Sequence, residues 1–150
     1  MSELRELYQE IILDHNRNPR NFGKLEGANR SQEGYNPLCG DHLHVHLMVQ
    51  DGRIEGISFE GSGCAISKAS ASMMTAALKG KQTNEAEEIF DNFHTMVMAD
   101  ASEPVDEEKI GKMAIFAGVR EFPMRVKCAT LAWHTMKAAL ADVDASVSTE

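Results

Sequence analysis

The clearest pattern in the sequence is an alternation of apolar and polar residues from Leu43 to Val49. An alternation of period two predicts a half-buried strand whose apolar residues face the core. Asp51-Gly52 follows and predicts a tight hairpin turn. Residues 53–60 then form the return strand, with a bulge near Gly56. A short edge strand around residues 28–34 would complete a small three-stranded antiparallel meander.

Apolar residues at helical spacing, together with helix start and stop signals, predict five helices. The predicted helices cover residues 4–16, 64–78, 84–97, 106–117 and 123–140. Residues 118–122 are expected to form a connection, and a small, polar tail from residue 142 is expected to fray. Because the sequence has no repeat and no linker that would divide the chain, residues 1–150 are expected to form a single domain.

Composition and charge argue against several classes of protein. The 150 residues are 43% hydrophobic and 25% charged, which is typical of a globular domain. A net charge of −8 argues against nucleic acid as a partner. No apolar run approaches the roughly 20 residues of a membrane span, and residues 1–10 lack the apolar core of a signal peptide. We therefore expect a cytoplasmic protein, in which three cysteines are reduced thiols for metal binding or catalysis.

Cys39-Gly40-Asp41 lies immediately before the predicted strand. A thiol and a carboxylate two residues apart point to the same side of an extended chain. Cys64 opens a predicted helix after Gly61-Ser62-Gly63, and Cys128 lies early in the last predicted helix, after Pro123. Thiolates and carboxylates are both zinc ligands, so Cys39, Asp41, Cys64 and Cys128 predict a tetrahedral site of three sulfurs and one oxygen.

The surroundings of these residues favour reactive thiolates. A helix N-terminus stabilises negative charge at Cys64, and Arg125 and Lys127 lie close to Cys128 in sequence. Asp41 is a harder, weaker donor than a fourth cysteine, so it would leave the site open to ligand exchange. Accessible thiolates can also accept sulfur by attack on a persulfide.

Structural interpretations of the same residues stay open. Cys64 and Cys128 can equally be small, buried core residues, and Asp41 can be a turn residue. The polar positions of the predicted strand carry three histidines, His42, His44 and His46. These suggest a metal-binding ladder at first sight, but we interpret them as the solvated face of an amphipathic strand.

Three stretches together resemble the IscU/NifU-N-terminal family of iron–sulfur cluster scaffolds. They are NPLCGD at residues 36–41, GSGCAIS at 61–67 and FPMRVKCATLAW at 122–133. The first helix and its exit, residues 7–23, match the family as well. The resemblance covers nearly the whole chain.

Within that family the sequence is similar to the SufU branch. IscU scaffolds carry a histidine immediately before the third cysteine, where this chain has Lys127. They also carry a chaperone-docking LPPVK motif, where this chain reads EFPMRVK at residues 121–127. The acidic stretch around residues 91–108 resembles the insertion that SufU proteins have between their second and third cysteines, and we place a helical insertion near 83–108. These departures argue against a chaperone partnership of the IscU kind.

The resemblance implies an α+β fold in which about five helices pack mainly on one face of a small three-stranded antiparallel sheet. It implies a zinc site made of Cys39, Asp41, Cys64 and Cys128, and it implies that Cys39 accepts persulfide sulfur. The implied partners are a pyridoxal-phosphate-dependent cysteine desulfurase of the SufS type and downstream cluster-assembly proteins. Docking of the desulfurase would open the zinc site by ligand exchange, and Arg125 would contact that partner.

The leading hypothesis is therefore a zinc-dependent sulfurtransferase in iron–sulfur cluster assembly. The alternative is a scaffold that assembles a [2Fe–2S] cluster on the same three cysteines and one aspartate, since thiolates suit both. A third class is a structural zinc domain without sulfur transfer. A disulfide oxidoreductase is disfavoured because the sequence has no CxxC pair.

Overall fold

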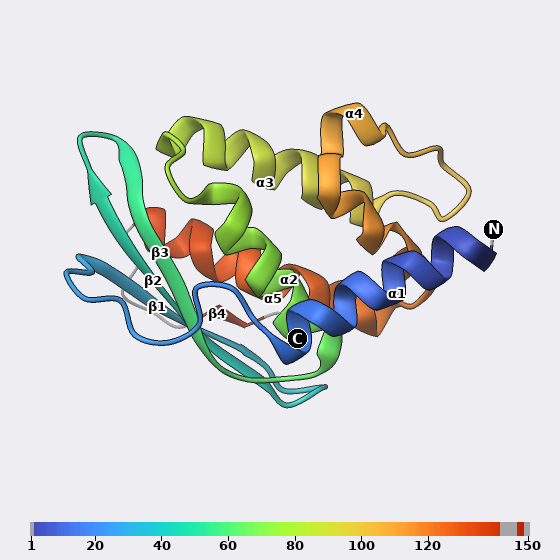
Figure 1. Cartoon of the computed structure of the whole chain (residues 1–150), viewed down its shortest axis with the longest axis horizontal. Helices are drawn as coiled ribbons and strands as arrows, with labels where there is room; N and C mark the ends of the chain where they lie inside the picture. The colour runs from blue at the N-terminus through green and yellow to red at the C-terminus, as the bar shows by residue number, and fades with distance from the viewer. Residues whose placement is uncertain (1, 142–146, 149–150) are drawn as a thin grey trace.

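The computed structural model describes residues 2–141 and 147–148. Strands β1 (Arg30–Asn36), β2 (Asp41–Gln50) and β3 (Arg53–Ser62) pair antiparallel in one sheet, and helices cover one of its faces (Figure 1). The predicted α+β fold with a three-stranded antiparallel sheet is therefore confirmed. A two-residue strand, β4 (Val147–Ser148), runs parallel to β1 and gives the order β3-β2-β1-β4.

The hairpin between β2 and β3 follows the sequence prediction closely. It turns at Asp51-Gly52, and its ladder contains the bulge that was expected near Gly56. The pairing skips Glu55, because Gly56 and Ile54 pair with consecutive residues of β2. The extra residue explains why Ile54 is buried on the same face as Phe59 although it breaks the alternation.

Four of the predicted helices lie close to their predicted positions, as α1 (Ser2–Arg17), α2 (Ala65–Leu78), α3 (Thr83–Met98) and α5 (Pro123–Leu140). The single helix predicted over residues 106–117 is wrong. It is divided into α4 (Glu107–Ile110) and the 3-10 helix η1 (Gly111–Glu121), which also includes most of the predicted connection. Gly111 has a φ of 66°, which a right-handed α-helix does not accommodate. None of the described helices is long and apolar enough to cross a membrane.

The core lies between the sheet and helices α2 and α5. Four odd-numbered residues of β2 were expected to face inward. Leu43, Val45 and Leu47 are buried, and Val49 is partly buried against the core. Trp133 of α5 is fully buried, and its Nε1 donates a hydrogen bond to the Ser70 Oγ of α2 at 3.1 Å. The Ser70 hydroxyl in turn donates to the Ala129 carbonyl at 2.6 Å. These two bonds hold α5 against α2 at Ala129, the residue that follows Cys128.

Helix α3, with which the predicted insertion at residues 83–108 begins, packs into the same core. It buries five side chains, Ala86, Phe90, Phe93, Met96 and Val97. The assignment of this segment as an insertion stays a prediction. The expected flexible tail from residue 142 lies mostly outside the described residues.

Candidate metal centre

Asp41 is the first residue of β2, and its side chain is fully buried. The alternation of the strand sends it to the same inward face as Leu43. One carboxylate oxygen, Oδ1, accepts a hydrogen bond from the Cys64 backbone N–H at 2.8 Å. A β-carbon on Gly63 would lie 2.8 Å from that oxygen, so a glycine is needed there to admit the carboxylate. The start of β2 is thereby joined to the start of α2.

Cys39 lies in the turn between β1 and β2 and is half-buried. Asn36, at the end of β1, organises this turn: its backbone carbonyl accepts from the Gly40 N–H at 2.8 Å and from the Cys39 N–H at 3.3 Å. Its side-chain Oδ1 accepts from the Leu38 N–H at 3.3 Å. The Cys39 thiol is therefore held by a turn, outside any helix or strand.

The other two cysteines belong to helices. Cys64 is the N-cap of α2, where its sulfur accepts a hydrogen bond from the Ser67 N–H at 3.4 Å. Cys128 lies in the second turn of α5 and is fully buried. The Cys128 Sγ is 3.2 Å from the Cys39 Sγ. Packing of α5 thus carries a residue 89 positions away into contact with the β1–β2 turn.

The thiols of Cys64 and Cys128 also interact, with opposite effects on their pKa values. The interaction with Cys128, helped by the Ser67 N–H, lowers the pKa of Cys64 to about 6, although burial opposes the shift. The same interaction and burial raise the pKa of Cys128. Of these two sulfurs, Cys64 is therefore the one on which negative charge is more stable.

Arg125 precedes Cys128 by nearly one helical turn. Its guanidinium lies near Cys64 and Cys128, and its pKa is raised, chiefly by the charge on Cys64. Because Arg125 is exposed, it adds a positive charge at the mouth of the thiol cluster.

The structure brings the four predicted ligands to one place, but only three of them lie close enough together to form a compact group. The ligand atoms of Cys39, Asp41 and Cys128 all lie within 4.8 Å of one another, as expected of a group that can hold a metal ion. Cys64 lies outside this group, beside Cys128. Three thiolates and one carboxylate are a donor set that suits zinc as well as an iron–sulfur cluster.

Sequence reasoning gave no role to Asn36, whose side chain is fully buried within this cluster. Its Nδ2 lies 3.5 Å from the Asp41 Oδ2 and 3.7 Å from the Cys128 Sγ. An amide that contacts both a carboxylate and a thiol orients the two ligands relative to each other. The available signal was the Asn-Pro pair at residues 36–37, which one residue separates from the first candidate ligand.

Comparisons with known proteins identify the family of this chain and agree with its fold. The sequence model of a family described as the NifU-like N terminal domain matches residues 7–129. An iron–sulfur cluster assembly scaffold protein IscU from Streptococcus pyogenes serotype M1 is 41% identical over 140 residues, which cover 93% of this chain and 86% of that protein. A zinc-dependent sulfurtransferase SufU from Bacillus subtilis strain 168 is 39% identical over 140 residues, which cover 93% of each chain.

Solved structures of similar proteins share the fold of this chain. A crystal structure of an iron–sulfur cluster assembly scaffold protein for the SUF system, from Fervidobacterium islandicum AW-1, matches with a TM-score of 0.80 and 37% identity. The match covers 87% of this chain and 94% of that one. A NifU-like N-terminal protein from Brucella abortus, at 23% identity, shares the fold with a TM-score of 0.80. At this similarity the relatives divide between the names IscU and SufU.

Proposed function

The chain belongs to the family of the NifU-like N-terminal domain, and on this premise we propose that it is a zinc-dependent sulfurtransferase of iron–sulfur cluster assembly. The observation that carries the proposal is the placement of Cys39. Cys128 lies within a buried helix and Cys64 caps another helix, whereas Cys39 lies in a turn. Cys39 can therefore leave a metal and return to it while both helices stay intact.

The metal would be held by Cys39, Asp41, Cys64 and Cys128, and bound zinc would keep the thiolates deprotonated and shielded. Asp41 is the weakest of these ligands for zinc, since its oxygen is also engaged by the Cys64 N–H. Asn36 and the Cys64 N–H hold the carboxylate in place when a sulfur ligand leaves. The relative from Bacillus subtilis, named a zinc-dependent sulfurtransferase, supports zinc as the ion.

The proposed reaction is a thiol–persulfide exchange on Cys39. The Cys39 thiolate attacks the terminal sulfur of a persulfide carried by a cysteine desulfurase. One S–S bond forms on Cys39 and the S–S bond of the desulfurase breaks, so that the desulfurase cysteine leaves as a thiolate. No net oxidation or reduction takes place. Cys39 then carries the sulfur to downstream proteins of cluster assembly.

The surface beside the site supports a protein partner. A groove of about 540 Å³ opens next to the thiol cluster. It is lined mainly by apolar residues of α1, α2 and η1, together with Gln9, Glu121 and Arg125. Phe122, which lines the groove, is more than half exposed, and so are Met124, one residue before Arg125, and Leu38, one residue before Cys39. Exposed apolar side chains next to an arginine are typical of protein–protein contact surfaces. We propose that the desulfurase docks here, with Arg125 in contact.

The decisive experiment compares wild-type protein with Cys39→Ala in the desulfurase reaction. Alanine production from cysteine is measured together with the mass of each cysteine-containing peptide. Wild-type protein should accelerate turnover and gain one sulfur atom on Cys39, and Cys39→Ala should do neither. Circular dichroism establishes that the variant is folded. Full acceleration by Cys39→Ala, or sulfur found on Cys64 or Cys128 alone, would end the assignment of Cys39 as acceptor.

A scaffold for a [2Fe–2S] cluster is the second candidate, because the relative from Streptococcus pyogenes is named a scaffold protein and the same donors suit iron. Metal and acid-labile sulfide in protein purified without air separate the two. Zinc without sulfide supports the sulfurtransferase. Iron and sulfide in near-equal amounts, with little zinc, would support the scaffold instead.

A further inference from the structure

The outward face of the sheet carries a second cluster of metal-ligating side chains. His42 and His44 are two residues apart on β2, so they point to the same side, opposite to the buried Asp41. On the neighbouring strand β1, Glu33 pairs directly with His44, and Tyr35 pairs with His42. Glu33 is therefore straight across from one histidine and diagonal to the other, within reach of both.

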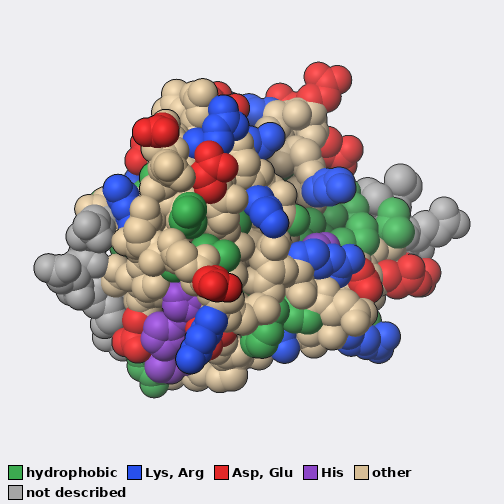
Figure 2. Space-filling view, turned by 60° about the vertical axis from the view of Figure 1, so that its left-hand side comes forward, with side chains coloured by type: hydrophobic (Ala, Val, Ile, Leu, Met, Phe, Trp, Pro, Cys, Tyr) green, Lys and Arg blue, Asp and Glu red, His purple; other side chains and the backbone are tan. Residues whose placement is uncertain are grey.

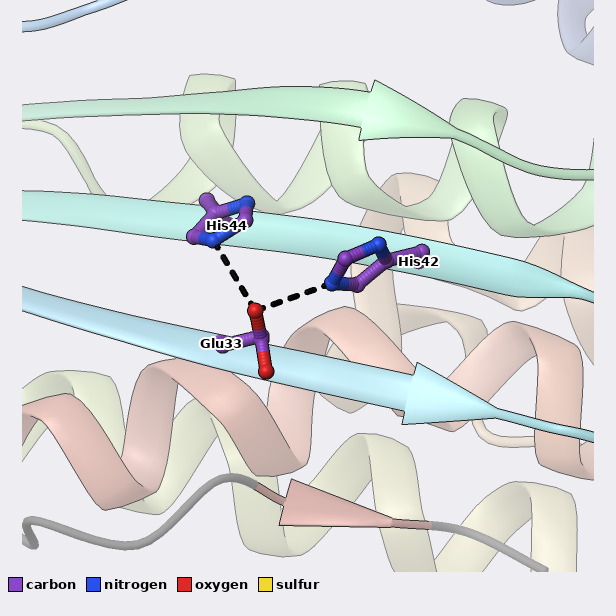
Figure 3. Close-up of side chains that lie close together, drawn as sticks. All are labelled: Glu33, His42 and His44. Atoms are coloured by element: carbon purple, nitrogen blue, oxygen red, sulfur yellow. Dashed lines mark ion pairs between the residues drawn. The ribbon is translucent and has the colours of Figure 1, made fainter.

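The two imidazoles converge on a single oxygen atom. The His42 Nε2 lies 3.0 Å and the His44 Nε2 lies 3.3 Å from the Glu33 Oε2 (Figure 3). All three ligand atoms lie within 4.8 Å of one another. The three side chains are between two-fifths and half exposed, so an ion can reach them from solvent. In the space-filling view, histidine side chains form a patch beside acidic ones (Figure 2).

These distances suit an ion held between the side chains as well as a direct ion pair. Zinc bonds nitrogen and carboxylate oxygen at about 2.0–2.2 Å, so tetrahedral ligand atoms lie roughly 3.3 Å apart. The two nitrogen–oxygen distances, 3.0 and 3.3 Å, are close to that length. Exposed side chains need only small adjustments to place an ion at the centre.

Neighbouring rings restrict the orientations of the two histidines. The Tyr35 ring packs edge-on against His42 with a centroid distance of 5.8 Å. The His46 ring stacks on His44 at 6.4 Å, with the planes only 11° apart. Ligands whose rotamers are already restricted lose less conformational entropy when an ion binds.

We propose that Glu33, His42 and His44 form a second binding site for a divalent transition-metal ion, with Zn²⁺ as the probe. Two imidazoles and one carboxylate are a recognised ligand set for zinc, with a fourth position left to water. The site is separate from the cysteine cluster, because it lies on the opposite face of the sheet. It also lacks thiolates, so its zinc would exchange more readily than zinc held by three sulfurs.

The same strand face supplies a matched control. The His46 Nε2 is 2.7 Å from the Glu60 Oε2, and its Nδ1 is 2.7 Å from the Ser31 Oγ. Both ring nitrogens of His46 are thus engaged by protein groups. His46→Asn removes an imidazole from this face but should leave the proposed ion with all three ligands.

The test is zinc binding at equilibrium to the full chain, measured as zinc retained per chain across a range of free Zn²⁺ concentrations. Wild-type protein should bind about one ion more than Glu33→Gln, as a single three-ligand site requires. His44→Asn should weaken the additional ion by more than about tenfold, whereas His46→Asn, which removes only the ring stacked on His44, should weaken it far less. Nitrogen-15 spectra of the histidine rings should show zinc shifting the Nε2 signals of His42 and His44 but not of His46.

The difference in bound zinc between wild-type protein and the three variants does not depend on what the cysteine site holds, because all four proteins contain the same cysteines. If the sulfur-transfer proposal failed, the expected difference in bound zinc between wild-type protein and Glu33→Gln would stay the same. Equal zinc content in wild-type protein and Glu33→Gln would overturn the inference. Loss of the ion in His46→Asn to the same extent as in His44→Asn would also overturn it, since the binding would then be a property of the whole histidine face.

Discussion

Asp41 and His42 are neighbours in the sequence, yet they belong to opposite faces of the sheet and to two different clusters of potential metal ligands. Asp41 faces inward, where it lies within 4.8 Å of the sulfurs of Cys39 and Cys128. His42 faces outward to solvent, where its nitrogen lies 3.0 Å from Glu33. The period of two along β2 thus separates a sulfur-rich cluster from a nitrogen-rich one within one residue.

The two clusters differ in how their side chains are held. On the inner face, Asp41 accepts from the Cys64 N–H, Cys64 accepts from the Ser67 N–H, and Cys128 is fixed by the packing of α5. On the outer face, two histidines and a glutamate are held by pairing between adjacent strands and by ring contacts. We therefore expect metal at the inner site to be coupled to folding and metal at the outer site to be coupled to it only weakly.

Metal removal should show the largest difference between the two faces. An ion that binds only the folded chain at roughly 1,000 times its dissociation constant stabilises it by about 4 kcal/mol. For a chain of this length, removal of one equivalent of zinc with a chelator should lower the melting temperature on the order of 10 °C. Thermal unfolding with and without chelator measures this decrease in melting temperature.

Glu33→Gln is the control for that measurement, since it alters only the outer cluster. The variant loaded with one equivalent of zinc should show nearly the wild-type decrease on chelation. A decrease that disappears in Glu33→Gln would mean that the outer cluster holds the stabilising ion, and the contrast between the faces would be reversed.

Gly63→Ala should produce a smaller effect that is confined to the inner face. The new β-carbon would lie 2.8 Å from the Asp41 Oδ1 and 3.2 Å from the Ser67 Oγ, so the carboxylate must move. We expect zinc at the cysteine site to bind about tenfold more weakly, as for other changes to groups that orient a ligand. Competition with a coloured zinc chelator measures the affinity.

Gly118→Ala is the matched substitution, because a β-carbon there meets nothing within 4 Å. It should leave zinc affinity unchanged. Equal weakening in both variants would show that the loss at Gly63→Ala reflects general destabilisation and not displacement of Asp41.

The smallest effect is expected for the His46–Glu60 pair on the outer face. The two side chains are 15% and 31% exposed and lie 2.7 Å apart. A double-mutant cycle with His46→Asn and Glu60→Gln, followed by urea unfolding in the presence of chelator, should give a coupling energy below about 1 kcal/mol. A coupling above about 2 kcal/mol would show that the outer face is part of what holds the sheet together, and the two faces would then differ less than proposed.

Much of the fold could be predicted because its signals are local. The alternation from Leu43 to Val49 gave both the strand and its buried face, and Asp51-Gly52 gave the hairpin. The division of residues 107–121 into two helical types was missed, since the apolar spacing continues across Gly111 while the backbone does not. Strand β4 was missed because two residues carry no periodicity.

For the candidate site, the sequence by itself determined which residue types were available: three thiols and a carboxylate, each at the edge or in the first turns of an element. Their assembly depends on tertiary structure, because Cys39 and Cys128 meet only through the packing of α5 against α2 and the sheet. The same holds for Asn36, whose contacts to Asp41 and Cys128 exist only after folding. Glu33 likewise joins the histidines only through the register of β1 on β2, which strand pairing fixes and local sequence does not.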